Sequence, residues 1–427
     1  MDFDVNLYSS TYESGPFEYE DFPLTEEPVY ILGEVYSALH DREELKDDIR
    51  SRIWLTYRKN FQNIGGTGPS SDQGWGCMLR CGQMMMAQVL ILRHLGRDWR
   101  WTLDCTDDAY WRILRMFEDK KMATYSIHQI ASMGEAEGKA VGQWFGPNTV
   151  AQVLKRISVY DDWSGVAVHI ALDNVVILDD INKLCKSAAP VKTKSQANGT
   201  TPVLPDGESF SEFVNDTPDS TRPGHESHRT ASPSRPTSNQ TWKPLMLIIP
   251  LRLGLTDINP IYFDSLKKCF TLKQSVGIIG GKPNHAHWFI GYVGKELIYL
   301  DPHTTQNVVD LEEKGTSDIT YHCQTPPSRM SFSRLDPSIA LVFYCKTEKD
   351  LEDLCKSFAV RDKTCRPMFE VHKHAPQAWP YEEKPNLRLV KAANSKSARG
   401  LSLSDFAVYD GVSTSGTSVD DEEFEII

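Results

Sequence analysis

Residues 71–83 read SDQGWGCMLRCGQ, and they place a cysteine at the start of a helix. Two glycines flank a tryptophan in a tight approach, and almost every residue of 78–95 favours helix. Cys77 therefore lies at or just before the first turn, where unpaired backbone N–H groups and the helix dipole favour a thiolate. The stretch predicts a nucleophilic cysteine, and a buried core cysteine is the alternative.

Composition sets the class of protein. The chain has 427 residues, 40% of them hydrophobic, and a net charge of −12, which argues against nucleic acid or an anionic membrane as the main partner. The longest apolar stretch, residues 245–255, is too short to span a bilayer. The acidic start lacks the apolar segment of a secretory signal, and nine cysteines in such a chain indicate reduced thiols. We therefore expect a cytoplasmic protein.

Composition also divides the chain into segments. Residues 1–30 predict a flexible N-terminal arm, residues 31–385 a folded domain, and residues 386–427 a flexible C-terminal tail. Residues 188–241 are rich in Ser, Thr, Pro, Asn and Gly, which predicts a disordered insertion within the domain.

The order of predicted elements indicates an α+β fold, with helices first and a sheet afterwards. Tyr57 falls on an aromatic stripe at helical spacing, a pattern usual for core residues. A glycine-containing turn at 294–296 predicts an antiparallel hairpin. The predicted helices are 36–62, 78–94 and 149–158, and the predicted strands are 245–250, 288–293, 297–300 and 339–345.

A cysteine nucleophile needs a base and a group that orients the base. Asp301 and His303 follow the second strand of the predicted hairpin, and residues two apart in extended chain point to the same side. His285 and His287, just ahead of the first strand, are rivals for the base. The residues by themselves leave this choice open.

Other chemistries find weaker support. Cys77 and Cys81 are four residues apart on one predicted helix, but no second ligand pair completes a zinc site. No phosphate-binding or dinucleotide fingerprint occurs. We therefore expect neither a metal nor a cofactor.

The chain resembles the autophagins, the cysteine proteases that process the ubiquitin-like modifiers of autophagy. The resemblance covers nearly all of residues 26–385 and rests on several long motifs in the same order. These motifs are residues 54–60, 65–72, 74–80, 94–99, 125–129, 142–152, 249–254, 280–284 and 301–306.

The resemblance implies a papain-like α+β fold with a small extra subdomain. It assigns Cys77 as the nucleophile and Asp301 and His303 as its partners, which favours His303 over the rival histidines. It also implies that Tyr57 helps to stabilise the oxyanion. Trp144 and Pro283 match the pair that forms a gate over the nucleophile, under which a tail ending in glycine would pass.

The last residues add a second contact. Phe424 and Ile427 follow a run of acids and resemble a motif that adds a strand to the sheet edge of a modifier. These two residues are therefore predicted to bind substrate together with the gate.

The resemblance implies a protease that cleaves after the C-terminal glycine of these modifiers. It would mature the precursor and release the form conjugated to phosphatidylethanolamine, acting at membranes only through that lipidated substrate. We expect a monomer. Two alternatives are a protease for ubiquitin or another ubiquitin-like protein, and a non-catalytic adaptor that binds the modifier.

Overall fold

The computed structural model describes residues 9–10, 21–186, 241–359 and 365–375. Within these ranges, no helix is both long enough and apolar enough to cross a membrane. The predicted insertion and tail motif lie outside the described residues, as does most of the N-terminal arm. The domain boundaries drawn from composition therefore stay predictions.

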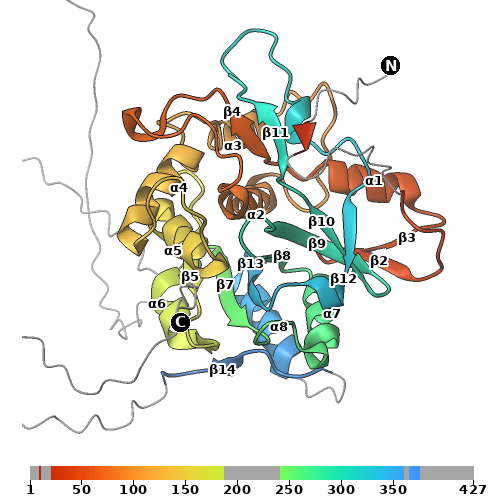
Figure 1. The fold of residues 1–427 in the computed structure, drawn as a ribbon. Coiled ribbons are helices and arrows are strands. Elements are labelled where there is room, and N and C mark those ends of the chain that lie inside the picture. The colour runs from red at the N-terminus through yellow and green to blue at the C-terminus, as the bar shows by residue number, and fades with distance from the viewer. Residues whose placement is uncertain (1–8, 11–20, 187–240, 360–364, 376–427) are drawn as a thin grey trace, which may run out of the picture. The chain divides into compact units, whose positions relative to one another are not determined.

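A nine-stranded mixed sheet forms the centre of the structure (Figure 1). All pairs along its main path are antiparallel except the parallel pair at one edge, between β5 and β7. A hairpin of β2 (Pro28–Ile31) and β3 (Glu34–Ser37) joins this sheet because β2 pairs with β9. The main path runs β12 (Ser328–Ser331), β10 (Glu296–Leu300), β9 (His287–Val293), β8 (Ser275–Gly280), β13 (Ser338–Cys345), β7 (Leu245–Arg252) and β5 (Ala167–Ile170).

Helices cover both faces of this sheet. In Figure 1, α2 lies above the sheet and α7 and α8 lie below it. The first face carries α2 (Cys77–His94), α3 (Asp108–Arg115), α4 (Ile127–Met133) and α5 (Pro147–Ile157). The opposite face carries α6 (Leu178–Cys185), α7 (Phe263–Thr271) and α8 (Glu348–Ala359), and α1 (Arg42–Arg50) packs beside β3.

Strand β7 shows why two cores form. Its apolar residues alternate between the faces, so that Met246 and Ile248 join the core around α2 while Leu247 and Ile249 join the opposite core. Such a strand reads as a continuous apolar run because both of its faces are buried. The core around α2 surrounds that helix completely, since every residue from Cys77 to Ile91 is buried.

Two small sheets complete the fold. One has the order β1 (Ser9–Ser10), β11 (Thr304–Asn307), β4 (Tyr57–Lys59), and the other pairs β14 (Glu370–His372) with β6 (Val175–Ile177). Short 3-10 helices occur at Ile64–Gly66, Gly134–Glu137, Ser158–Tyr160, Pro260–Tyr262, Ile319–Tyr321 and Phe332–Arg334.

The predicted helix over 36–62 is confirmed only over Arg42–Arg50, and its first two residues lie in β3. Helix α1 ends at Arg50, and Tyr57 lies in strand β4. The backbone of β4 pairs with β11, far along the chain, and this tertiary pairing overrides the helical spacing of the aromatic residues. The other predicted helices and strands are confirmed with shifts of a few residues at their ends.

Candidate active site

Cys77 is the first residue of α2 and is fully buried. Gly76 precedes it as the N-cap, and Asp72 fills the space beside that glycine. A Cβ on Gly76 would lie 2.3 Å from Asp72 Oδ2, so the approach requires glycine here. The first turn of α2 contains no acidic residue that would oppose a thiolate.

A buried ionic network holds this approach to the helix. Arg80 donates to both carboxylate oxygens of Asp72, at 2.8 and 2.9 Å, and to Asp119 Oδ1 at 2.8 Å. Asp72 Oδ1 also accepts from the backbone N–H of Arg58 at 2.7 Å. All these side chains are buried, so the network ties the turn before Cys77 to the body of α2 and to the start of β4.

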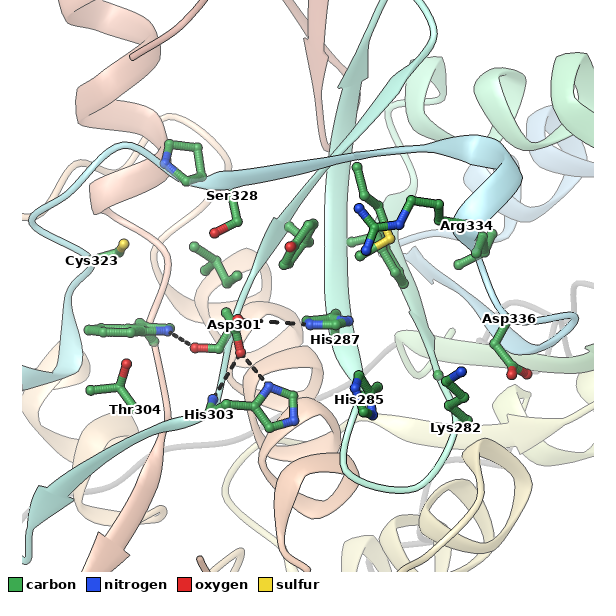
Figure 2. A pocket seen from close by; sticks show the side chains of 18 of the residues that line it. Lys282, His285, His287, Asp301, His303, Thr304, Cys323, Ser328, Arg334 and Asp336 are labelled. Carbon is green, nitrogen blue, oxygen red and sulfur yellow. Dashed lines mark hydrogen bonds and ion pairs between the residues drawn. The ribbon is translucent and has the colours of Figure 1, made fainter. Parts of the chain in front are cut away.

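Asp301 and His303 leave the end of β10 together, as the sequence predicts. His303 donates its backbone N–H to Asp301 Oδ1 at 2.9 Å, and its Nδ1 lies 2.5 Å from the same oxygen. Figure 2 shows both interactions at the wall of a cavity. The double contact fixes the imidazole with Nδ1 toward the carboxylate and leaves Nε2 on the far side of the ring.

Strand pairing brings Tyr57 to the same place. β11 begins at Thr304 and runs parallel to β4, with Thr305 opposite Tyr57. The backbone N–H of Tyr57 donates to the carbonyl of Pro302 at 2.9 Å. Its buried ring meets that of His303 edge to face, with ring centroids 5.5 Å apart.

Opposing effects set the pKa values of Cys77 and His303. Burial acts against both charged forms, but each group hydrogen-bonds to the other, and Asp301 holds the imidazolium. The pKa of Cys77 is lowered, helped by hydrogen bonds from the backbone of Ala286 and from Tyr57, and that of His303 rises to about 9. Both shifts favour a thiolate–imidazolium pair over a neutral thiol and a neutral imidazole.

The two rival histidines occupy different positions. His285 is exposed, and its Nδ1 lies 3.1 Å from the carbonyl oxygen of Pro283. His287 is largely buried, with Nε2 3.9 Å from Asp301 Oδ2, and burial lowers its pKa to about 4. Neither histidine is among the groups that lower the pKa of Cys77.

The two predicted gate residues, Trp144 and Pro283, differ in exposure. Pro283 is exposed in the loop between β8 and β9, and Trp144 is half-buried against the core around α2. The loop starts at Gly281, whose φ of +136° and close approach to the carbonyl of His285 exclude a side chain. It ends at Ala286, beside the thiol. The gate itself stays a prediction.

A cavity of about 790 Å³ opens on the His303 side of the site (Figure 2). Its wall combines the Asp301–His303 pair with apolar groups such as Phe289 and Leu300, and its rim carries charges of both signs from Lys282, Arg334, Asp257 and Asp336. Donor atoms of His287, Asp301 and His303 lie within 4.8 Å of one another, the spacing of a metal site. The hydrogen bond between Asp301 and His303 already explains why these donor atoms lie close together.

Three further residues that the sequence analysis singled out are Cys81, Phe424 and Ile427. Cys81 is fully buried and burial raises its pKa well above the usual value, so it stays a thiol. Phe424 and Ile427 lie outside the described residues.

Sequence reasoning missed two groups that touch the catalytic residues. The indole N–H of Trp54 donates to the backbone carbonyl of Asp301 at 2.7 Å, and the backbone of Ala286 hydrogen-bonds to Cys77. Backbone groups carry no signal in the sequence, and Trp54 stands among aromatic residues at helical spacing, where nothing distinguishes it.

Comparison with known proteins identifies the family of the chain. Residues 42–357 match the peptidase C54 catalytic domain. The chain is 50% identical over 382 residues to cysteine protease ATG4B of Gallus gallus, covering 88% of this chain and 92% of that protein. It is 52% identical over 359 residues to cysteine protease ATG4B of Xenopus laevis (83% and 86%) and 48% identical over 365 residues to cysteine protease ATG4A of Homo sapiens (84% and 86%).

Proposed function

The chain belongs to the peptidase C54 family of papain-like cysteine proteases, the autophagins, and we propose that it cleaves after the C-terminal glycine of ubiquitin-like modifiers of autophagy. One observation carries this proposal: a buried thiol at a helix start is hydrogen-bonded to a histidine that an aspartate holds. Cys77 is the nucleophile, His303 the acid and base, and Asp301 the group that orients His303.

The reaction is acyl transfer in two steps. The Cys77 thiolate attacks the glycine carbonyl, and the carbon–nitrogen bond breaks as His303 gives its proton to the leaving amine. The product of this step is a thioester between the modifier and Cys77. His303 then takes a proton from water, whose oxygen attacks the thioester, and the thiolate leaves with the glycine carboxylate released.

The oxyanion needs donors that face it when the carbonyl oxygen becomes charged. The hydroxyl of Tyr57 and the backbone N–H of Cys77 fill this role. The hydrogen bond between Tyr57 and the thiol in the free protein supports this role. One such donor is typically worth about 2.7–4 kcal/mol of transition-state stabilisation.

Glycine at the cleavage site follows from the narrow access to a buried thiol. Trp144 and the loop that carries Pro283 form the gate in this proposal, and the end of that loop touches the thiol through Ala286. A glycine tail is thin enough to pass beneath an indole, and a residue with a Cβ would clash. Binding of the globular part of the modifier stabilises the open state.

Two substrates fit this chemistry. One is a precursor with residues after the glycine, and the other is a modifier whose glycine forms an amide with phosphatidylethanolamine. We propose that the protein acts on both from the cytoplasm as a monomer, and that Phe424 and Ile427 recruit the modifier by adding a strand to its sheet.

The test is cleavage of a modifier precursor followed by mass spectrometry. The wild type, Cys77→Ala, His303→Ala and the control His285→Ala are compared on a precursor with an added C-terminal extension. We expect a product that ends at the glycine with the wild type and His285→Ala, and none with the other two. A second arm uses modifier conjugated to phosphatidylethanolamine in vesicles.

Two outcomes would overturn the proposal. Binding of the modifier without cleavage by the wild type favours the adaptor, and cleavage of a ubiquitin fusion but not of the autophagy modifier favours a protease for ubiquitin.

A further inference from the structure

His287 is an imidazole beside Asp301 that the proposed reaction does not use, and its side chain is only 11% exposed. Its Nε2 lies 3.9 Å from Asp301 Oδ2, whereas Asp301 Oδ1 bonds to His303 at 2.5 Å. Figure 2 shows contacts from the carboxylate to both imidazoles. Each carboxylate oxygen therefore faces a different histidine.

Packing fixes the ring of His287. The residue is the first of β9 and pairs with Gly280 of β8, so its backbone is held within the sheet. Its ring centroid lies 4.4 Å from that of Tyr299, 5.9 Å from Phe289 and 5.3 Å from His303. The imidazole is thus a rigid wall on one side of Asp301.

The charge around His287 keeps it neutral. Burial disfavours the imidazolium most, and the positive groups of His303, His285 and Arg334 act in the same direction. Asp301 alone opposes them, and the pKa of His287 falls to about 4. A neutral ring can turn an N–H toward the carboxylate without competing for the proton that His303 carries.

Asp301 needs such a wall because its side chain is 38% exposed, at the edge of the cavity. The terminal torsion of an aspartate is soft, so an open carboxylate can rotate and hydrate. A rotated carboxylate would lose its contact with Nδ1 of His303. The imidazolium would then be less stable, and the thiolate of Cys77 with it.

We propose that His287 is a positioning residue that keeps the Asp301 carboxylate turned toward His303. At 3.9 Å the contact is longer than a direct hydrogen bond, so His287 acts through the dipole of its N–H group and through the bulk of its ring. The kinetic part of this inference rests on the proposed function, and the effect on the thiol of Cys77 does not.

The first experiment needs no substrate. Alkylation of Cys77 by iodoacetamide is followed against pH by peptide mass spectrometry in the wild type, in His287→Phe and His287→Gln, and in the control His40→Ala. His40 is exposed and lies outside the cavity. Phenylalanine keeps the bulk but removes the N–H, and glutamine restores an N–H donor. We expect the apparent pKa of the Cys77 thiol to rise in His287→Phe and to stay near the wild-type value in the other two.

The second experiment measures cleavage of the modifier precursor by the same proteins. We expect His287→Phe to lower kcat about 10-fold with an unchanged KM. This loss is smaller than the rate enhancement of about 10²–10⁴-fold that general acid–base catalysis typically supplies. His287→Gln should recover most of this loss. A global loss of packing would instead affect both variants alike.

The outcomes separate the positioning role of His287 from the proposed protease function. An alkylation profile of His287→Phe equal to that of the wild type would overturn the role of His287, whatever the cleavage assay gives. Loss of Cys77 reactivity in both His287 variants would overturn it also, by making His287 a structural residue. A reactive wild-type thiol with no cleavage of any modifier would refute the proposed function alone.

Discussion

At Cys77 and His303, burial and charge act in opposite directions, and the charge prevails. Burial alone would favour a neutral thiol and a neutral imidazole, because both charged forms lose solvation. The hydrogen bond between them and the carboxylate of Asp301 reverse this preference. The same arrangement thus favours both the thiolate of Cys77, which is the nucleophile, and the imidazolium of His303, which is the proton donor.

The pH profile of kcat/KM should follow from these two groups. As pH rises through about 9, His303 loses the proton that the leaving amine needs, and activity should fall. As pH falls, activity should persist below the usual pKa of a thiol, because the pKa of Cys77 is lowered, and decline once Cys77 is protonated. Initial rates of precursor cleavage from pH 4 to 11 measure both limbs. An upper limb near pH 6.5, the value of an unperturbed imidazole, would contradict the assignment.

Replacing Tyr57 tests the oxyanion donor. Tyr57→Phe keeps the buried ring and removes the hydroxyl, so kcat should fall about 10²-fold with little change in KM. Single-turnover kinetics with the precursor provide the measurement, and Tyr160→Phe, at an exposed position, is the matched control. A kcat within a factor of two of the wild type would remove Tyr57 from the reaction.

At the scale of elements, the start of α2 depends on Arg80. Arg80→Met removes the buried cation between Asp72 and Asp119 and leaves two carboxylates without their partner. The free energy of unfolding should fall by about 3–5 kcal/mol, measured by urea denaturation. The exposed pair of Arg50 and Asp47 offers a control, and Arg50→Met should cost at most about 1 kcal/mol. Equal effects of the two substitutions would contradict this account of the approach to Cys77.

The elements also show where sequence patterns succeed. Helix α2 and strand β7 are strongly apolar over long runs, and both are predicted to within two residues. Strand β4 has only three residues and pairs with a strand far along the chain, so local periodicity assigns it to a helix. Parallel pairing between distant segments leaves no local signal in the sequence. For this reason, the sequence pattern wrongly predicts a helix at Tyr57.

At the scale of the whole molecule, the chain leaves and re-enters the fold around residues 187–240 at neighbouring points. The backbone N–H of Lys243 donates to the carbonyl of Cys185 at 2.8 Å, and Lys186 forms an ion pair with Glu348. A short Gly/Ser linker can therefore span the gap. Replacing residues 187–240 with such a linker shortens the loop about eightfold, which should raise stability by about 2 kcal/mol.

Thermal unfolding and precursor cleavage of this variant measure the effect. We expect a Tm equal to or above that of the wild type and an unchanged kcat/KM. A lower Tm together with lost cleavage would show that the segment belongs to the folded domain.

The site could be foreseen only in part. The residues of 71–83 and the Asp301–His303 pair point to a cysteine nucleophile and a base, but the choice among three histidines needed the family resemblance. The contacts of Trp54 and Ala286 depend on backbone groups that come together only in the fold. The opposite oxygens of Asp301, facing His287 and His303, likewise appear only when β9 and β10 are paired.

The most direct test of the central claim is covalent capture of Cys77 by the modifier itself. A modifier whose terminal glycine carries an electrophile in place of its carboxyl group is incubated with the wild type and Cys77→Ala. Intact mass and peptide mapping then locate the bond. We predict one equivalent of modifier on Cys77 in the wild type and none in Cys77→Ala. Stable binding of the modifier without a bond to Cys77 would contradict it.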